Sequence, residues 1–383
     1  MTIDPPSRGL GGTANGTVPI LEPPQLGPDD LVIAVMGVTG CGKTTFVNHF
    51  SDYPLMIGHG LDSCTQIVQV VPCTLASGSK IYLVDTPGFD DQLRSDSEIL
   101  RELALWLNSA HKLKIKLTGI VYLHRILDVR IGGTGARNIR MFKKLCGQES
   151  LGSVVLATTM WDFLPDPTKG HEREAELKRE KLLWKPMIDL GSEMMRQDNG
   201  RLSAMKIIEY LMNRSKPVVL EIQREMVDQK MQLGQTAAGA EVTSEAEKAK
   251  QYYDKKIAEL EDQLKDALLK QDHDRKEELE DAKLEWQERL QRGEENLKDV
   301  QSKLRADSDQ LYEEMKNRYE KEMEAMTKMM QEKEQAVFEA QTQVNQMKET
   351  HGQELKIQEL QLKMKWKEQY YKMLYGPTKC IVM

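Results

Sequence analysis

The sequence predicts an α/β domain with a mostly parallel sheet flanked by helices, followed by a long α-helical tail. From residue 31 to about residue 215, apolar runs rich in Val, Ile and Leu alternate with turn signals and amphipathic stretches. Continuous apolar runs are typical of strands that helices cover on both faces of a sheet. There is no proline between Pro217 and Pro377, so that stretch is expected to be helical.

Five strands are expected within the α/β domain, which we place at residues 30–215. They are the runs Leu31–Met36, Ile67–Cys73, Lys80–Val84, Leu117–Leu123 and Ser153–Thr158. Residues 1–29 are rich in Gly, Pro, Thr and Asp and are expected to form a disordered leader. After the domain we expect a connecting helix and a glycine-containing break over residues 216–243, and a flexible C-terminus over residues 376–383.

The tail between them, residues 244–375, is expected to form a long helix that restarts at a capping box beginning with Ser244. Residues 244–383 hold 32 acidic and 26 basic side chains, too many for a core of their own. A spacing of seven between apolar residues indicates a coiled coil, as at Leu290, Leu297, Leu304 and Leu311. The alternative is a solvated single helix held by i,i+4 ion pairs. If uninterrupted, the helix would be on the order of 190 Å long.

Composition excludes several classes of function. The net charge of -7 argues against nonspecific nucleic-acid binding, which needs a basic stripe. The five cysteines are scattered and form no CxxC pair, so neither a disulfide framework nor a zinc site is indicated. No run approaches the roughly 18 apolar residues of a spanning helix. We therefore expect a protein of a reducing, cytoplasmic compartment without a transmembrane segment.

The stretch GVTGCGKT, residues 37–44, follows the first expected strand and fits the phosphate-binding pattern G-x-x-x-x-G-K-[ST]. Its glycines let backbone N–H groups surround an anion at the start of a helix. Lys43 is expected to reach the β- and γ-phosphates, and Thr44 to ligate Mg²⁺. The residues expected to contact the nucleotide here are Gly37, Gly40, Gly42, Lys43, Thr44 and Thr45.

A second element is the stretch DTPG, residues 85–88, at the end of a buried strand. Asp85 is placed to hold Mg²⁺ through water, and the amide of Gly88 is placed to sense the γ-phosphate. This stretch favours a switch GTPase over a small-molecule kinase. Thr65 is the natural second hydroxyl for Mg²⁺; a surface turn residue is the alternative.

A third element, TMWD at residues 159–162, stands where GTPases carry [NT]-K-x-D. Asp162 is expected to accept hydrogen bonds from the N1–H and the 2-amino group of guanine, donors that adenine lacks. Met160 replaces the usual lysine, and its flexible side chain can cover one face of the base. The alternative is an aspartate that merely ends a strand.

Together these elements resemble the septin-like GTPases, among them the immunity-associated nucleotide-binding proteins and the chloroplast outer-envelope receptor GTPases. The likeness is closest to fungal members that share TTMWD and carry a C-terminal coiled coil. It covers roughly residues 30–215 and rests on GVTGCGKT, Thr65, DTPG and TMWD, and residues 122–147 look like a segment that these families insert. The resemblance implies GTP or GDP with Mg²⁺ as ligands and a last base contact from Asn199 in RQDNG.

Phe89 follows Gly88 where many GTPases place a glutamine that orients water. Phenylalanine cannot do this, so slow hydrolysis is expected, with Lys43, Thr65 and Gly88 as the catalytic candidates. A second protomer or a rearranged polar residue would complete the site. Self-association is expected through both the GTPase domain and the coiled coil.

The last residues, KCIVM, read as a C-a-a-X farnesylation signal at Cys380; a coincidental terminal cysteine is the alternative. The final 23 residues hold five lysines against one acid. One lipid chain binds membranes weakly, and a basic patch is an accepted second signal. We therefore expect a peripheral protein on the cytosolic face of a membrane.

Two functions are compatible with the sequence. The first is a membrane-anchored, self-associating switch that binds GTP and hydrolyses it slowly. The second is a coiled-coil scaffold in which guanine nucleotide is a structural cofactor with little turnover. DTPG and Asp162 disfavour an ATP-driven machine or a P-loop kinase.

Overall fold

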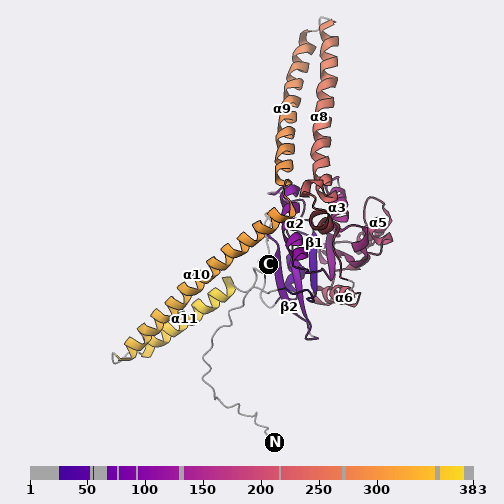
Figure 1. Ribbon diagram of the computed structural model, residues 1–383. Helices are drawn as coiled ribbons and strands as arrows, with labels where there is room; N and C mark the ends of the chain where they lie inside the picture. Colours follow the sequence, from indigo (N-terminus) through magenta and orange to yellow (C-terminus); the bar gives the residue numbers. More distant parts are fainter. Residues whose placement is uncertain are drawn as a thin grey trace.

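The computed structural model describes most of the chain as an α/β domain that carries two helical hairpins (Figure 1). The residues described are 26–51, 55, 67–75, 77–91, 94–128, 133–214, 217–269, 273–349 and 354–374. The predictions made for Thr65, Cys380 and most of the leader lie outside these residues.

A six-stranded sheet forms the centre of the α/β domain, with the strand order β2-β3-β1-β4-β5-β6. β2 pairs antiparallel with β3 and the other neighbours are parallel, which confirms the mostly parallel sheet. The strands are β1 (Val32–Gly37), β2 (Gln69–Thr74), β3 (Lys80–Asp85), β4 (Gly119–Arg125), β5 (Val154–Thr159) and β6 (Glu193–Arg196). The sequence indicated the first five strands but missed β6, a short edge strand with no fully buried residue.

Helices cover both faces of the sheet, so side chains of β1 alternate between two cores. Ile33 and Val35 pack with α1 and α6, whereas Ala34 and Met36 pack with α2 and α3. The helices of the domain are α1 (Lys43–Asn48), α2 (Asp96–Lys112), α3 (Gly133–Cys146), α4 (Pro167–Arg179), α5 (Lys185–Asp189) and α6 (Gly200–Asn213).

The chain then passes through short turns into the first helix of the tail, α8 (Ala237–Leu269). These turns are α7 (Glu221–Gln223), a π-helical turn (Arg224–Asp228) and a 3-10 turn (Leu233–Gln235). The restart expected at Ser244 is wrong, because α8 begins seven residues earlier.

Thr236 and Gly239 lie at the start of α8. The hydroxyl of Thr236 accepts a hydrogen bond from the N–H of Gly239 at 3.0 Å. A Cβ on Gly239 would overlap the carbonyl oxygen of Leu233, so the glycine permits a close approach instead of breaking the helix.

The tail is helical as expected, but its described part is divided into four helices, so a helix with little interruption is wrong. α9 (His273–Lys303) follows α8, and α11 (Glu354–Leu374) follows α10 (Ser308–Glu349). Lys250–Glu294 and Lys283–Glu261 ion pairs, each 2.8 Å, fix α8 and α9 as an antiparallel pair (Figure 1). No helix of the described residues is both long and apolar enough to cross a membrane.

The break between α9 and α10 is caused by bonds to the 3-10 turn at the base of the first hairpin. The N–H groups of Leu233 and Gly234 donate to the carbonyls of Ala306 and Leu304, both at 2.9 Å. Leu304 and Ala306 are buried there. The non-helical residues 304–307 thus return the chain to the α/β domain, where α10 begins.

The apolar core extends well beyond residue 215, where the sequence placed the end of the domain. α2 is apolar around most of its circumference, and its outer side needs a cover that the sheet cannot supply. Tail residues provide it and join the same core: Val300, Leu304, Ala306, Leu311 and Met315.

Ion pairs reinforce the packing of α10 on α2. The guanidinium of Arg318 donates to both carboxylate oxygens of Glu102, at 2.8 and 2.9 Å. Lys112 pairs with Asp309 at 2.6 Å at the other end of the contact. The base of the tail is therefore an integral part of the α/β domain.

Candidate functional site

The loop between β1 and α1 holds the predicted phosphate-binding residues in a tight curve. The ammonium group of Lys43 donates to the carbonyls of Gly37 at 3.3 Å and Val38 at 3.0 Å. Gly40 and Gly42 have φ angles of 75° and 93°, which favour glycine. A Cβ on Gly37 would overlap the carbonyl oxygen of Leu123. The glycines of the motif are therefore required by the backbone as well as by its expected ligand.

Thr44 and Asp85 lie together beside this loop. Asp85 is the last residue of β3, is paired in register with Val35 of β1 and is buried. The hydroxyl of Thr44 donates to its carboxylate at 2.8 Å. A hydroxyl and a carboxylate are oxygen ligands that suit Mg²⁺, which uses few protein ligands beside phosphate and water. Among the residues that the structure describes, no group of three or more His, Cys, Asp or Glu is placed to hold a metal ion.

The DTPG segment packs directly on the phosphate-binding loop. The N–H of Thr39 donates to the carbonyl of Phe89 at 2.8 Å, and the N–H of Phe89 donates to Gly37 at 3.3 Å. A Cβ on Gly88 would come within 2.6 Å of the backbone of Thr39, so only glycine fits. The Phe89 side chain is 1% exposed and packs in the core that contains α2.

The segment that follows β5 is tied to the same loop by Thr159. Its hydroxyl donates to the carbonyl of Cys41 at 2.9 Å. Met160 has a φ of 63°, which turns the chain so that Asp162 is exposed. Trp161 anchors this turn, because its indole N–H donates to the hydroxyl of Thr158 at 3.1 Å. Asp162 is thus held at the edge of the sheet beside the phosphate-binding loop.

Asn199 lies on the next loop, between β6 and α6, and is exposed. β6 runs parallel to β5, so the loop that follows it lies at the same edge of the sheet, and Arg201 donates to the carbonyl of His49 at the end of α1. Thr45 is exposed in the first turn of α1. Among the residues that the structure describes, the predicted site residues therefore follow the carboxyl ends of β1, β3, β5 and β6, where open α/β sheets bind ligands.

Comparisons with known proteins concern the same part of the chain. Residues 32–125 match the family described as "50S ribosome-binding GTPase". The N-terminal sheet is that of a P-loop GTPase domain. A search of curated proteins found no match. The finer resemblance to septin-like and fungal proteins stays a prediction.

Solved structures similar to the GTPase domain include chloroplast proteins. Toc33 from Arabidopsis thaliana with GDP and Mg²⁺ is 17% identical over 50% of this chain and 88% of its own, with a TM-score of 0.39. Toc33 with Mg²⁺ and GMPPNP is 18% identical over 50% of this chain and 88% of its own, with a TM-score of 0.40. A third structure is 16% identical over 49% of this chain and 86% of its own, with a TM-score of 0.41. It is described by the statement that dimerization is important for the GTPase activity of the chloroplast translocon components atToc33 and psToc159.

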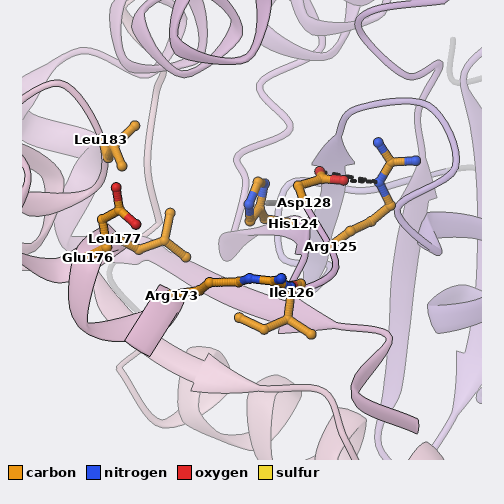
Figure 2. A pocket seen from close by; sticks show the side chains of 8 residues that line it. All are labelled: His124, Arg125, Ile126, Asp128, Arg173, Glu176, Leu177 and Leu183. Atoms are coloured by element: carbon orange, nitrogen blue, oxygen red, sulfur yellow. Dashed lines mark hydrogen bonds and ion pairs between the residues drawn. The ribbon is translucent and has the colours of Figure 1, made fainter. Parts of the chain in front are cut away.

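A small cavity of about 80 Å³ lies beside the end of β4 in the GTPase domain and is shown in Figure 2. It has room for water but not for a nucleotide. Arg125 pairs there with Asp128 at 3.1 Å, and its guanidinium would lie 3.6 Å from a Cβ on Gly40. The lining residues are His124, Arg125, Ile126, Asp128, Arg173, Glu176, Leu177 and Leu183.

Arg125 is a residue near the phosphate-binding loop that the sequence reasoning missed. Its position as the last residue of β4 was the available signal, because parallel strands end at one edge. Its neighbour His124 is buried against Trp184, and burial lowers the pKa of His124 to about 4. Burial also raises the pKa of the Cys41 thiol, which fits a packing role for Cys41 within the loop.

Proposed function

We propose that this chain binds GTP with Mg²⁺, hydrolyses it slowly, and acts as a membrane-anchored, self-associating switch of the septin-like type. The observation that carries the nucleotide assignment is the bond from Thr159 to the carbonyl of Cys41. It fixes the segment with Asp162 against the phosphate-binding loop. A base bound by one segment and phosphates bound by the other would then belong to a single ligand.

The described residues divide the work as follows. Lys43, which bonds to the carbonyls of Gly37 and Val38, would turn to the phosphates, whose oxygens replace those carbonyls as acceptors, and the loop amides would donate to the same phosphates. Thr44 and Asp85 would hold Mg²⁺, which would supply positive charge to offset that of the phosphates. Thr65, proposed as a further Mg²⁺ ligand, lies outside the described residues. Gly88 senses the γ-phosphate through its amide.

The base is selected by Asp162, with Asn199 as a second contact and Met160 covering one face. Asp162 is exposed and lies on a turn whose shape is fixed by its neighbours, so its carboxylate is available to a ligand. Two charge-assisted hydrogen bonds from guanine would favour GTP over ATP.

Slow hydrolysis is supported by the burial of Phe89. The side chain is buried in the core that also contains Met36 and Ile99, and it offers no polar group to a water molecule. A second protomer, or a polar residue that rearranges, supplies what is missing. The same burial favours the second candidate function, a scaffold in which bound nucleotide is structural and turns over little.

The anchor is the predicted farnesyl group on Cys380 together with the lysine-rich end of the chain, which places the protein on the cytosolic face of a membrane. Cys380 lies outside the described residues. The proposal rests on the sequence of the last residues and on the basic charge that precedes them.

The nucleotide assignment is tested by calorimetric titration with GDP, ADP and a non-hydrolysable GTP analogue. GDP is expected to bind well and ADP weakly. Asp162→Asn should weaken GDP binding by roughly tenfold to a hundredfold, since hydrogen bonds to charged groups contribute about 1.5–3 kcal/mol each. The same variant should gain affinity for xanthosine diphosphate, because the carbonyl at C2 of xanthine can accept a hydrogen bond from the new amide.

The matched control is Asp166→Asn, in a half-buried aspartate four residues away that caps α4. It should leave GDP binding unchanged. Equal binding of ADP and GDP, together with an indifferent Asp162→Asn, would contradict the assignment.

A further inference from the structure

α11 has one apolar face that the structure covers and a second that it leaves in solvent. Leu360 and Met364 are half-buried on the side of α10. Leu362, Trp366 and Tyr370 recur at i, i+4 and i+8 on the opposite face, where they are 64%, 70% and 52% exposed. Large apolar side chains in such a stripe mark an interaction surface and not ordinary solvated residues.

α10, which pairs with α11, also carries an exposed aromatic residue. Phe338 is 72% exposed and lies 11 residues before the end of α10, whereas Trp366 lies 12 residues after the start of α11. α11 runs beside α10 on an arm that extends away from the sheet (Figure 1). Because the two helices are antiparallel, Phe338 and Trp366 lie at nearly the same height, on the order of 17 Å from the end of α10 and the start of α11 respectively.

The charges around the stripe identify its partner. Exposed Lys363, Lys365 and Lys367 flank it, against a single acid, Glu368, in residues 360–370. α10 carries ten acidic and six basic residues. The hairpin is thus positive on the outer side of α11 and negative overall along α10. Tryptophan and tyrosine between lysines suit the boundary between lipid headgroups and acyl chains.

We propose that the outer face of α11 lies on the surface of a bilayer that contains anionic lipid. The stripe of Leu362, Trp366 and Tyr370 enters the headgroup region, the lysines bind lipid phosphates and carboxylates, and the acidic α10 faces away. This deepens the membrane location proposed above by naming a second contact, which does not need the farnesyl group on Cys380.

The test uses the full chain made without prenylation and phosphatidylcholine vesicles with or without phosphatidylserine, separated by sedimentation. The protein is expected to bind the anionic vesicles and to bind neutral ones far more weakly. Leu362→Ala combined with Trp366→Ala should lower binding by roughly a hundredfold. Replacing Lys363, Lys365 and Lys367 with Gln should lower it by roughly fivefold per lysine.

The matched control replaces Leu269 and Leu284 with Ala, two exposed leucines of the first hairpin, and should bind vesicles as the parent chain does. Helix content by circular dichroism should be equal in all variants. Failure of the unprenylated chain to bind would overturn the α11 proposal. If Trp366→Ala then halved the molecular mass measured in solution by light scattering, the stripe would be assigned to a contact between two copies of the chain.

The farnesyl anchor is tested separately with the prenylated chain. Binding by the prenylated chain alone would leave the anchor standing and remove the α11 contact. Equal binding by both forms would keep the α11 contact and remove the need for the anchor.

Discussion

Leu311→Ala tests whether the tail is part of the GTPase domain. Leu311 lies in the first turn of α10 and is fully buried in the core that contains α2. The substitution removes three carbon atoms, about 2.4 kcal/mol at about 0.8 kcal/mol per carbon. The Arg318–Glu102 and Lys112–Asp309 pairs on either side limit collapse of the cavity, which adds to the cost. We expect unfolding free energy to fall by about 3–4 kcal/mol.

The assay is urea unfolding followed by tryptophan fluorescence, since Trp106 and Trp184 are buried in the same core. Leu284→Ala, an exposed leucine of α9, is the control and should change stability by less than about 0.5 kcal/mol. A loss at Leu311 no greater than the loss at Leu284 would refute the conclusion that α10 completes the core.

Two further predictions concern turnover and pH. Because Phe89 offers no group to water, a dilute sample should hydrolyse GTP at on the order of 10⁻⁴ to 10⁻² s⁻¹, and the rate per molecule should rise with protein concentration; fast, concentration-independent turnover would contradict this. Burial holds the pKa of His124 at about 4, below its ordinary 6.5, so the unfolded chain takes up this proton first as the pH falls. The contribution of neutral His124 to the free energy of unfolding is therefore fully present above about pH 6.5, and that free energy should be roughly 2 kcal/mol lower at pH 5. His124→Gln should remove that part of the pH dependence of urea unfolding, and an unchanged pH dependence would show that His124 is not the group responsible.

The sheet was predictable because its strands are buried on both faces and read as unbroken apolar runs. The phosphate-binding loop was predictable for a different reason: Gly37, Gly40 and Gly42 are imposed both by the ligand and by the backbone. The edge strand β6 has neither property, since its sequence EMMR holds only two apolar residues and none of its residues is fully buried.

The hairpins could not be predicted from periodicity. The heptad spacing through Leu297, Leu304 and Leu311 is real, but Leu304 is taken out of the helix by backbone bonds to residues 233 and 234, which are distant in sequence. Gly239 falls in the glycine-containing break expected over residues 216–243, yet it lies within α8 as a point of close approach to Leu233. The interruption at Leu304 depends on tertiary contacts that no local pattern records.

The late arrival of α10 has a consequence for synthesis of the chain. α2 ends at Lys112, whereas Leu311 and Met315, which cover its outer side, are about 200 residues further on. At about 5–20 residues per second, the ribosome needs roughly 10–40 s to supply them. During that interval the nascent α/β domain carries an uncovered apolar face on α2. Its folding is therefore finished only when most of the tail has emerged, and chaperones have a defined period in which to bind it.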